Sequence, residues 1–188
     1  MIVVSTSRRP NPRLRSFAKD LARALPKAIK LNRGKLSISA LAQHAYELGA
    51  DLIVLVNRGS SGNPGRIFFI KILEGSYVFF PLILRVSGVK LLREEPAASP
   101  IEKVETACII YGGNSGELNN LVEGLSTILN IPFYNVPKPT MFRREYDIII
   151  LVEKISKGYS IKFLNSRNLL PAGPKIRVDK VFFHKPYP

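Results

Sequence analysis

The octapeptide Asp51-Leu-Ile-Val-Leu-Val-Asn-Arg58 recurs 96 residues later as Asp147-Ile-Ile-Ile-Leu-Val-Glu-Lys154. Each copy is a short apolar run, typical of a strand that is buried on both faces. A strand that begins at a glycine follows each copy, from Gly65 and from Gly158. The repeat predicts an internal duplication, although two buried strands that each follow a loop aspartate can also resemble each other by chance.

The residues around the first copy predict strands that alternate with helices. Asn11 and Pro12 are a capping residue and a first-turn proline for a helix that ends at Pro26. Either Ser37 or Ser39 caps a second helix, which Gly49 ends. Apolar runs bounded by turn residues predict strands at 2–5, 28–31, 51–56, 66–73 and 77–86.

The same plan restarts after a Pro/Ala/Ser-rich stretch. Residues 117–129 place their leucines on one helical face, and strands are expected at 104–111, 132–136, 147–152, 159–165 and 175–183. The fold class is therefore α/β: two similar α/β halves from an internal duplication. Each half is a mixed, partly parallel sheet with helices, to which a hairpin adds antiparallel edges. The expected boundaries are 1–93 for the first half, 94–103 for the linker and 104–188 for the second half.

The charge of the chain is unevenly distributed. The 188 residues carry a net charge of +14, with +9 in residues 1–35, −2 in 36–137 and +7 in 138–188. A charge this large favours an anionic partner, nucleic acid first and an anionic membrane surface second. A merely solvated face is the alternative, but solubility alone does not call for such segregation.

Several classes of protein are disfavoured by composition. Cys108 is the one cysteine, so no internal disulfide forms, and together with His44 and His184 it makes no recognisable zinc cluster. We expect no metal and no cofactor. No run of 18 apolar residues exists, and a strand-like tetrapeptide precedes the first arginines, which is the wrong order for a signal peptide. A cytoplasmic protein without membrane contact is therefore expected.

Three glycine-bearing loops could cradle phosphate: 32–35, 58–66 and 112–116. The loop at 112–116 lies between a strand and a helix, where backbone N–H groups favour anions, but no Lys-Ser/Thr follows its last glycine as in a Walker A motif. The loop at 58–66 is expected to be mobile and has an arginine at each end. Asp51 and Asp147 begin strands, where a turn or capping role is usual, and Cys108 reads as a small buried hydrophobe.

Three N-terminal segments carry a resemblance to a known family: Val4-Ser-Thr-Ser-Arg-Arg-Pro10, Arg13-Leu-Arg-Ser-Phe-Ala-Lys-Asp20 and Leu31-Asn-Arg-Gly-Lys-Leu-Ser37. They resemble the Brix-domain family of ribosome-biogenesis proteins, in particular the member found in the small-subunit processome. Gly75-Ser-Tyr-Val-Phe-Phe80 looks like a diverged copy of the family's Gly-Pro-Thr-Ala strand entry, and Gly173-Pro-Lys-Ile-Arg177 matches in the second half. The chain looks like a stand-alone archaeal form.

The resemblance implies two α/β halves related to the anticodon-binding domain of class II aminoacyl-tRNA synthetases. It also implies RNA binding without catalysis, as a factor that binds pre-rRNA or other structured RNA during rRNA processing, beside ribosome-assembly proteins. Arginines and lysines from both basic ends would line a groove between the halves. The candidate RNA-binding residues are Ser7, Arg8, Arg9, Arg13, Arg15, Lys19, Asn32, Arg33, Lys35, Arg58, Arg66, Arg143 and Arg144.

Two other readings stay open. The chain could be an RNA-processing enzyme or a nucleotide-dependent factor that uses the 112–116 loop, or a protein-interaction scaffold whose charge is incidental. An effect of magnesium or of a nucleotide on labelled RNA incubated with the purified protein would favour the enzyme or nucleotide-dependent factor. A protein complex that survives ribonuclease treatment would favour the scaffold.

Overall fold

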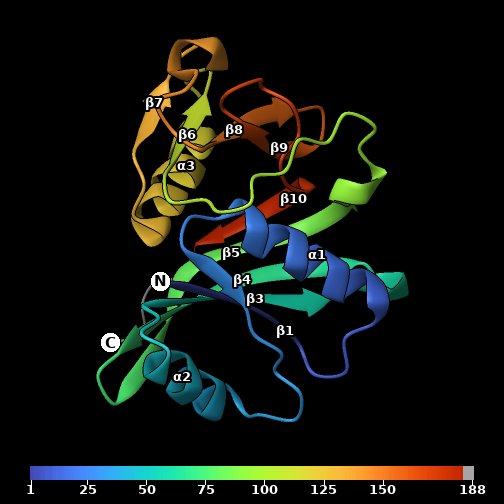
Figure 1. Cartoon of the computed structure of the whole chain (residues 1–188), viewed down its shortest axis with the longest axis vertical. Coiled ribbons are helices and arrows are strands. Elements are labelled where there is room, and N and C mark those ends of the chain that lie inside the picture. Colours follow the sequence, from blue (N-terminus) through green and yellow to red (C-terminus); the bar gives the residue numbers. More distant parts are fainter. Residues whose placement is uncertain (184–188) are drawn as a thin grey trace.

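A computed structural model describes residues 1–183 and arranges their strands in one ten-stranded sheet, in the order β2-β1-β3-β4-β5-β10-β9-β8-β6-β7 (Figure 1). The first half contains β1 (Ile2–Thr6), α1 (Pro12–Ala24), β2 (Ala28–Lys30), α2 (Ile38–Glu47), β3 (Leu52–Arg58), β4 (Pro64–Leu73) and β5 (Ser76–Lys90). The second contains β6 (Ala107–Tyr111), α3 (Gly116–Leu129), β7 (Phe133–Asn135), β8 (Ile148–Ile155), β9 (Gly158–Asn165) and β10 (Lys175–Phe183). Three single turns of 3₁₀ helix are η1 (Ser60–Gly62), η2 (Leu92–Glu94) and η3 (Pro139–Phe142).

The two halves repeat one pattern of strand directions. In the first, β1 pairs in parallel with β2 and β3, and β3, β4 and β5 follow one another antiparallel. In the second, β6 pairs in parallel with β7 and β8, and β8, β9 and β10 follow antiparallel. The second half differs in having η3 where the first has α2.

Two expectations about the sheet were wrong. The halves do not form a sheet each, because β5 pairs antiparallel with β10 and joins them. The hairpin strands therefore lie at the centre of the sheet, and the short parallel strands β2 and β7 form its edges. The backbone groups of a strand as long as β5, with 15 residues, would stay unpaired along one side if it ended the sheet, whereas pairing with β10 satisfies them.

The helices begin where the capping residues predict. The Asn11 side chain accepts a hydrogen bond from the Leu14 amide at 2.9 Å, and Pro12 opens α1. Ser37, and not Ser39, caps α2 by accepting from the Ala40 amide at 3.0 Å. Both contacts satisfy an amide that the first helical turn leaves without a backbone partner.

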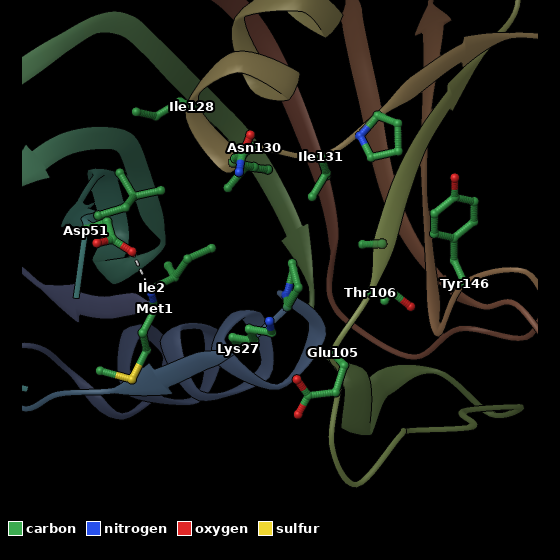
Figure 2. A pocket seen from close by; sticks show the side chains of 15 residues that line it. Met1, Ile2, Lys27, Asp51, Glu105, Thr106, Ile128, Asn130, Ile131 and Tyr146 are labelled. Carbon is green, nitrogen blue, oxygen red and sulfur yellow. Dashed lines mark hydrogen bonds and ion pairs between the residues drawn. The ribbon is translucent and has the colours of Figure 1, made fainter. Parts of the chain in front are cut away.

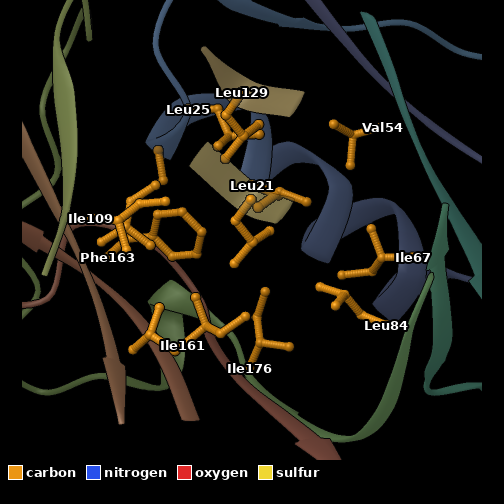
Figure 3. Close-up of a cluster of buried hydrophobic side chains, with 14 of the residues drawn as sticks. Leu21, Leu25, Val54, Ile67, Leu84, Ile109, Leu129, Ile161, Phe163 and Ile176 are labelled. Carbon is orange, nitrogen blue, oxygen red and sulfur yellow. The ribbon is translucent and has the colours of Figure 1, made fainter. Parts of the chain in front are cut away.

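One face of the sheet, called here the first face, carries α1 and α3 over a core that both halves share. Leu21 of α1 and Leu129 of α3 lie over apolar side chains such as Leu84 of β5 and Phe163 of β9 (Figure 3). A small apolar cavity of about 30 Å³ remains among them. The halves therefore fold as one cooperative body around this core.

The opposite face, called here the second face, is covered only at its two ends. At one end α2 packs Leu41 and Ala45 against Ile53 and other strand residues of the first half. At the other end Phe142 of η3 stacks on Tyr134 with ring centroids 4.2 Å apart, over Cys108. Among residues 1–183, no member of these two clusters lies on β10, so the centre of the second face carries no covering element.

Gly173 lies where the two halves pack tightly against each other. A Cβ atom at this position would lie 2.5 Å from Cβ of Ala24, at the end of α1, and 2.8 Å from Cβ of Phe163. The Gly173-Pro174 pair thus lets β10 enter the sheet directly beneath α1. This close approach explains why glycine, which has no Cβ atom, begins the Gly173-Pro-Lys-Ile-Arg177 segment.

Asp51 and Asp147 occupy matching places, at the amino ends of β3 and β8. The Asp51 carboxylate pairs with the α-amino group of Met1 at 2.7 Å, directly before β1. The Asp147 carboxylate accepts from the amides of Glu105 (2.9 Å) and Thr106 (3.0 Å), directly before β6. Each aspartate therefore ties two parallel strands together at the same end, which is the capping role predicted for it.

Substituting Gly173 by alanine should destabilise the protein by about 1–3 kcal/mol, because the added methyl group overlaps Ala24 and Phe163. At this chain length the melting temperature should fall by roughly 2–4 °C for each kcal/mol. Chemical denaturation of Gly116→Ala provides the control, since a Cβ at Gly116 meets nothing within 4 Å. Equal stability of both variants would contradict the close packing of the halves at Gly173.

Asp147→Asn should destabilise the protein near neutral pH by about 1 kcal/mol, allowing for solvent screening of a partly exposed carboxylate. Burial alone would raise the pKa of Asp147, but the hydrogen bonds from Glu105 and Thr106 outweigh it and lower the pKa. A lowered pKa contributes stability above the unfolded-state value of about 3.9, and that contribution is lost as the pH falls through the folded-state pKa. Denaturation curves of wild type and variant should therefore converge below about pH 4; a difference that persists at pH 2 would contradict this.

Candidate nucleic-acid interface

The carboxyl ends of β1, β2 and β3 bring together five of the eleven basic residues expected to bind RNA. The amide of Arg58, at the end of β3, donates to the Ser7 hydroxyl at 3.2 Å. The Arg8 Nε atom donates to the Leu36 carbonyl at 3.4 Å, and the Arg33 Nε atom donates to the same oxygen at 3.0 Å. We call this cluster the carboxyl-edge patch; its residues are Ser7, Arg8, Arg9, Asn32, Arg33, Lys35 and Arg58.

The carboxyl-edge patch has little acidic compensation. Within residues 1–183, none of its arginines or lysines forms an ion pair. Burial, with the charge of Arg8 as a second cause, lowers the pKa of Arg33. Arg8, Arg9 and Lys35 are exposed, so their charges face solvent at the edge of the sheet.

The glycine-rich loop that follows Arg58 is tied down rather than free. Its two ends touch, because a Cβ at Gly59 would lie 2.7 Å from Cα of Gly65. The Asn11 side-chain amide, besides capping α1, donates to the Gly62 carbonyl at 2.8 Å. Arg66, just beyond the loop, is exposed and pairs across the strands with Asn57 of β3.

Three other predicted residues of α1 have separate environments. Arg13 pairs with Glu94 at 2.6 Å and donates to the Val89 carbonyl, so it holds the end of β5 against α1 and lies outside the carboxyl-edge patch. This pairing, with the Leu91 amide, lowers the pKa of Glu94. Arg15 is exposed and donates to the Pro10 carbonyl at 3.1 Å. Lys19 points to a different basic cavity.

That basic cavity, of about 630 Å³, lies between α1, β2 and the segment before β6. Its cations come from the first half and the linker: Lys19, Arg23, Lys27, Lys30 and Lys103. Lys103 is neutralised by Glu105 at 2.6 Å. The prediction singled out only Lys19 among these residues, because the others belong to no motif.

Arg143 and Arg144 do not join the carboxyl-edge patch. The Arg143 Nε atom donates to the Arg167 carbonyl at 2.8 Å, and the Arg144 amide donates to the Ser166 carbonyl. Both follow η3, which is the orange turn at the top of Figure 1, whereas the loop at 31–37 leads into α2 at the bottom. Two separate basic regions therefore exist where one groove was expected.

The cavity between the two halves is not lined by arginines. It measures about 360 Å³ and lies where the amino ends of β1 and β3 face those of β6 and β8 (Figure 2). Its charged side chains are Lys27, Asp51 and Glu105. The predicted basic groove was wrong at this place, because the basic loops follow the carboxyl ends of the strands and the halves meet at the amino ends.

The 112–116 loop holds no feature of a nucleotide site beyond its glycines. Two of its acceptor oxygens are used within the fold, since the Asn135 side chain donates to the Gly113 carbonyl and to the Asn114 side chain. Glu117 stands in the first turn of α3 and accepts a hydrogen bond from the Tyr159 hydroxyl at 3.1 Å. A carboxylate at a helix N-terminus takes the place an anion would favour and repels phosphate.

Metal-ligating side chains are scattered over residues 1–183 and not clustered beside these surfaces. Within residues 1–183, no three His, Cys, Asp or Glu side chains are grouped to hold a metal ion, and no helix is long and apolar enough to cross a bilayer. Cys108 is fully buried, and burial, with a smaller effect of Glu145, raises the pKa of its thiol to about 12. The prediction of a small buried hydrophobe is confirmed for Cys108; His184 lies outside the described residues.

Known proteins similar to the chain agree on one family, although no family model matches it. It is 30% identical to a probable Brix domain-containing ribosomal biogenesis protein of Pyrococcus furiosus, over 95% of this chain and 83% of that protein. A protein of the same description from Aeropyrum pernix is 43% identical over 48% of the chain and 50% of its own length.

A solved structure supports the same conclusion for the fold. The crystal structure of a probable ribosomal biogenesis protein from Aeropyrum pernix K1 superimposes with a TM-score of 0.80 and 27% identity, covering 95% of each chain. The likeness therefore extends over the entire ten-stranded architecture and not only over the N-terminal segments quoted above. The chain belongs to the Brix domain-containing ribosomal biogenesis proteins.

Proposed function

We propose that the protein is a non-catalytic RNA-binding assembly factor in ribosome biogenesis, which binds pre-rRNA during rRNA processing through the carboxyl-edge patch. The observation that carries the proposal is the convergence of Arg8 and Arg33 on the carbonyl of Leu36. Two guanidinium groups held side by side without a carboxylate repel each other until an anion binds between them. Guanidinium groups match the oxygens of a phosphate and stay charged at every physiological pH.

The local backbone prepares this patch for binding. Arg8 and Arg9 follow the fully buried strand β1 and precede Pro10 and the capped start of α1. Holding the backbone in place lowers the entropy lost when a long side chain engages a ligand. The carboxyl ends of parallel strands are also where α/β sheets collect their ligands.

The RNA itself is proposed to be structured pre-rRNA. Phosphate contacts from the patch would set affinity and register but carry no sequence information. Selectivity would come from single-stranded or bulged segments whose bases stack or hydrogen-bond to the loops. Ser7 and Asn32 are the neutral hydrogen-bonding groups in the patch; the Asn32 oxygen accepts from Lys30 at 2.7 Å. Other assembly proteins would bind elsewhere on the surface.

The matching strand order supports an evolutionary proposal as well. We propose that the halves, 1–93 and 104–188 with the linker 94–103, arose by duplication and share an origin with the anticodon-binding domain of class II aminoacyl-tRNA synthetases. Both the strand directions and the places of Asp51 and Asp147 favour this origin over a chance likeness. The replacement of α2 by η3 would then be a later divergence of the second half.

Replacing Arg8 and Arg33 together by glutamine should weaken binding to a structured RNA with little effect on folding. If each arginine neutralises one phosphate, the plot of log K against log salt should become shallower by about 1.4–1.8. At 0.1 M salt this corresponds to a loss of affinity of about 20- to 60-fold. Filter binding over a salt series measures both quantities.

The matched control is Lys71→Gln with Lys138→Gln, which removes the same charge from exposed positions outside the patch. It should keep the wild-type slope, and the melting temperatures of all three proteins should agree, because exposed charges contribute little to stability. If the control and the patch variant lose affinity equally, only net charge matters and the proposed site is wrong. A wild-type salt slope near zero would contradict the proposal that the protein binds RNA electrostatically.

A further inference from the structure

The centre of the second face carries a row of cations that the strand register sets against one another. Arg66 of β4 stands directly opposite Arg85 of β5, and Arg85 stands opposite Lys180 of β10. Side chains that are paired across strands lie on the same face, with Cβ atoms about 5 Å apart. Three positive charges therefore line up across three neighbouring strands.

A fourth cation extends this row along β10, the strand that carries Lys180. Arg177 of β10 is flanked by Ile176 and Val178, which are both buried on the first face, so its own side chain points to the second face. It lies over β5, because a Cβ at its partner Gly88 would be 3.9 Å from Cδ of Arg177. We call Arg66, Arg85, Arg177 and Lys180 the central cation row.

The central cation row is compensated by one acid. Asp179 accepts from Arg85 Nε at 2.9 Å and pairs with its Nη2 at 2.5 Å. Arg66, Arg177 and Lys180 are exposed, and none of them forms an ion pair with another residue between 1 and 183. Like charges directly opposite each other destabilise a sheet, so the row lowers the stability of the protein when no ligand is bound.

The row also continues from the carboxyl-edge patch. Arg66 pairs with Asn57, the neighbour of Arg58, whose amide contacts Ser7. From β3 to β10 the path crosses three strand spacings, or roughly 14 Å. A single cationic track thus leads from the patch over the uncovered centre of the sheet, between α2 at one end and η3 at the other.

We propose that the central cation row binds the phosphate backbone of the same RNA, which leaves the carboxyl-edge patch and runs across β4, β5 and β10. This inference rests on the proposed function and extends its site to three residues from both halves. Charge complementarity identifies the occupant: an uncovered face with unpaired cations on β4 and β10, the strands on either side of β5, fits a polyanion better than an apolar protein segment. The Arg85–Asp179 pair positions the row, and Arg66, Arg177 and Lys180 contact phosphate.

The test is a triple variant, Arg66→Gln with Arg177→Gln and Lys180→Gln, compared with Lys71→Gln, Arg93→Gln and Lys138→Gln. Both variants lose three exposed positive charges. With a structured RNA, the row variant should have a salt slope shallower by about 2.1–2.7 and an affinity lower by about 100- to 500-fold at 0.1 M salt. The control should stay near wild type, because charges far from bound RNA are screened.

Three outcomes separate this inference from the proposed function. If the row variant binds RNA as wild type does while Arg8→Gln with Arg33→Gln loses affinity, the patch binds RNA and the row does not. If wild type shows no salt-dependent RNA binding, the proposed function and the proposed role of the central cation row are both wrong. Stability gives the third readout: Arg66→Gln alone should raise the melting temperature by about 1–3 °C, since it removes the repulsion with Arg85. A lower melting temperature with unchanged affinity would make Arg66 structural and overturn the proposal.

Discussion

The antiparallel pairing of β5 with β10 is the interaction on which the rest of the structure depends. It joins residues that are about 90 positions apart in the chain, from Lys90 with Lys175 to Leu82 with Phe183. Because of it, the apolar sides of both halves form one continuous core under α1 and α3 (Figure 3). The same pairing brings the amino ends of the parallel strands to one cavity, which leaves the carboxyl ends of the halves directed away from each other.

That arrangement places different kinds of charged groups at the two ends of the parallel strands. At the amino ends, Asp51 and Asp147 tie strands together, and the cavity between them has charges of both signs (Figure 2). At the carboxyl ends of the strands in the first half, the guanidinium groups of Arg8 and Arg33 share a backbone carbonyl and have no acidic partner among residues 1–183. Cations that stabilise the fold, such as Arg13 with Glu94, are paired. The pairing state of each arginine thus distinguishes those that serve the fold from those available to an anionic ligand.

Local patterns in the sequence predicted most of the fold. Apolar runs and capping residues placed the three α-helices and the strands to within a few residues, because those signals act between near neighbours in the chain; the 3₁₀ turns η1, η2 and η3 were not predicted. The pairing of β5 with β10 was not predictable in this way, since no residue pattern within either strand identifies the strand with which it pairs. The single sheet, the open centre of the second face and the opposition of Arg85 to Lys180 all follow from that pairing and were missed for the same reason. The opposition of Arg66 to Arg85 comes from the register of the β4–β5 hairpin instead.

The candidate site was predicted in part. Arg8, Arg33 and Arg58 come together because they follow parallel strands, a rule that the sequence pattern is enough to apply. The positions of Arg13 and Arg143 outside the patch were not predictable, since charge alone cannot show that one pairs with Glu94 and that the other lies in the second half, on the Arg167 carbonyl. The internal repeat also predicted too much likeness between the halves. In the second half η3 replaces α2, and Arg143 and Arg144 follow this turn instead of joining the carboxyl-edge patch.

The most direct test of a cationic track across the sheet is photocrosslinking of the full chain to a structured RNA, followed by identification of the crosslinked peptides. The account predicts crosslinks in the segments around residues 7–9, 31–36 and 57–66, and on β5 and β10 around residues 85 and 177–180. Crosslinks confined to the 112–117 loop or to residues 138–146 would contradict it.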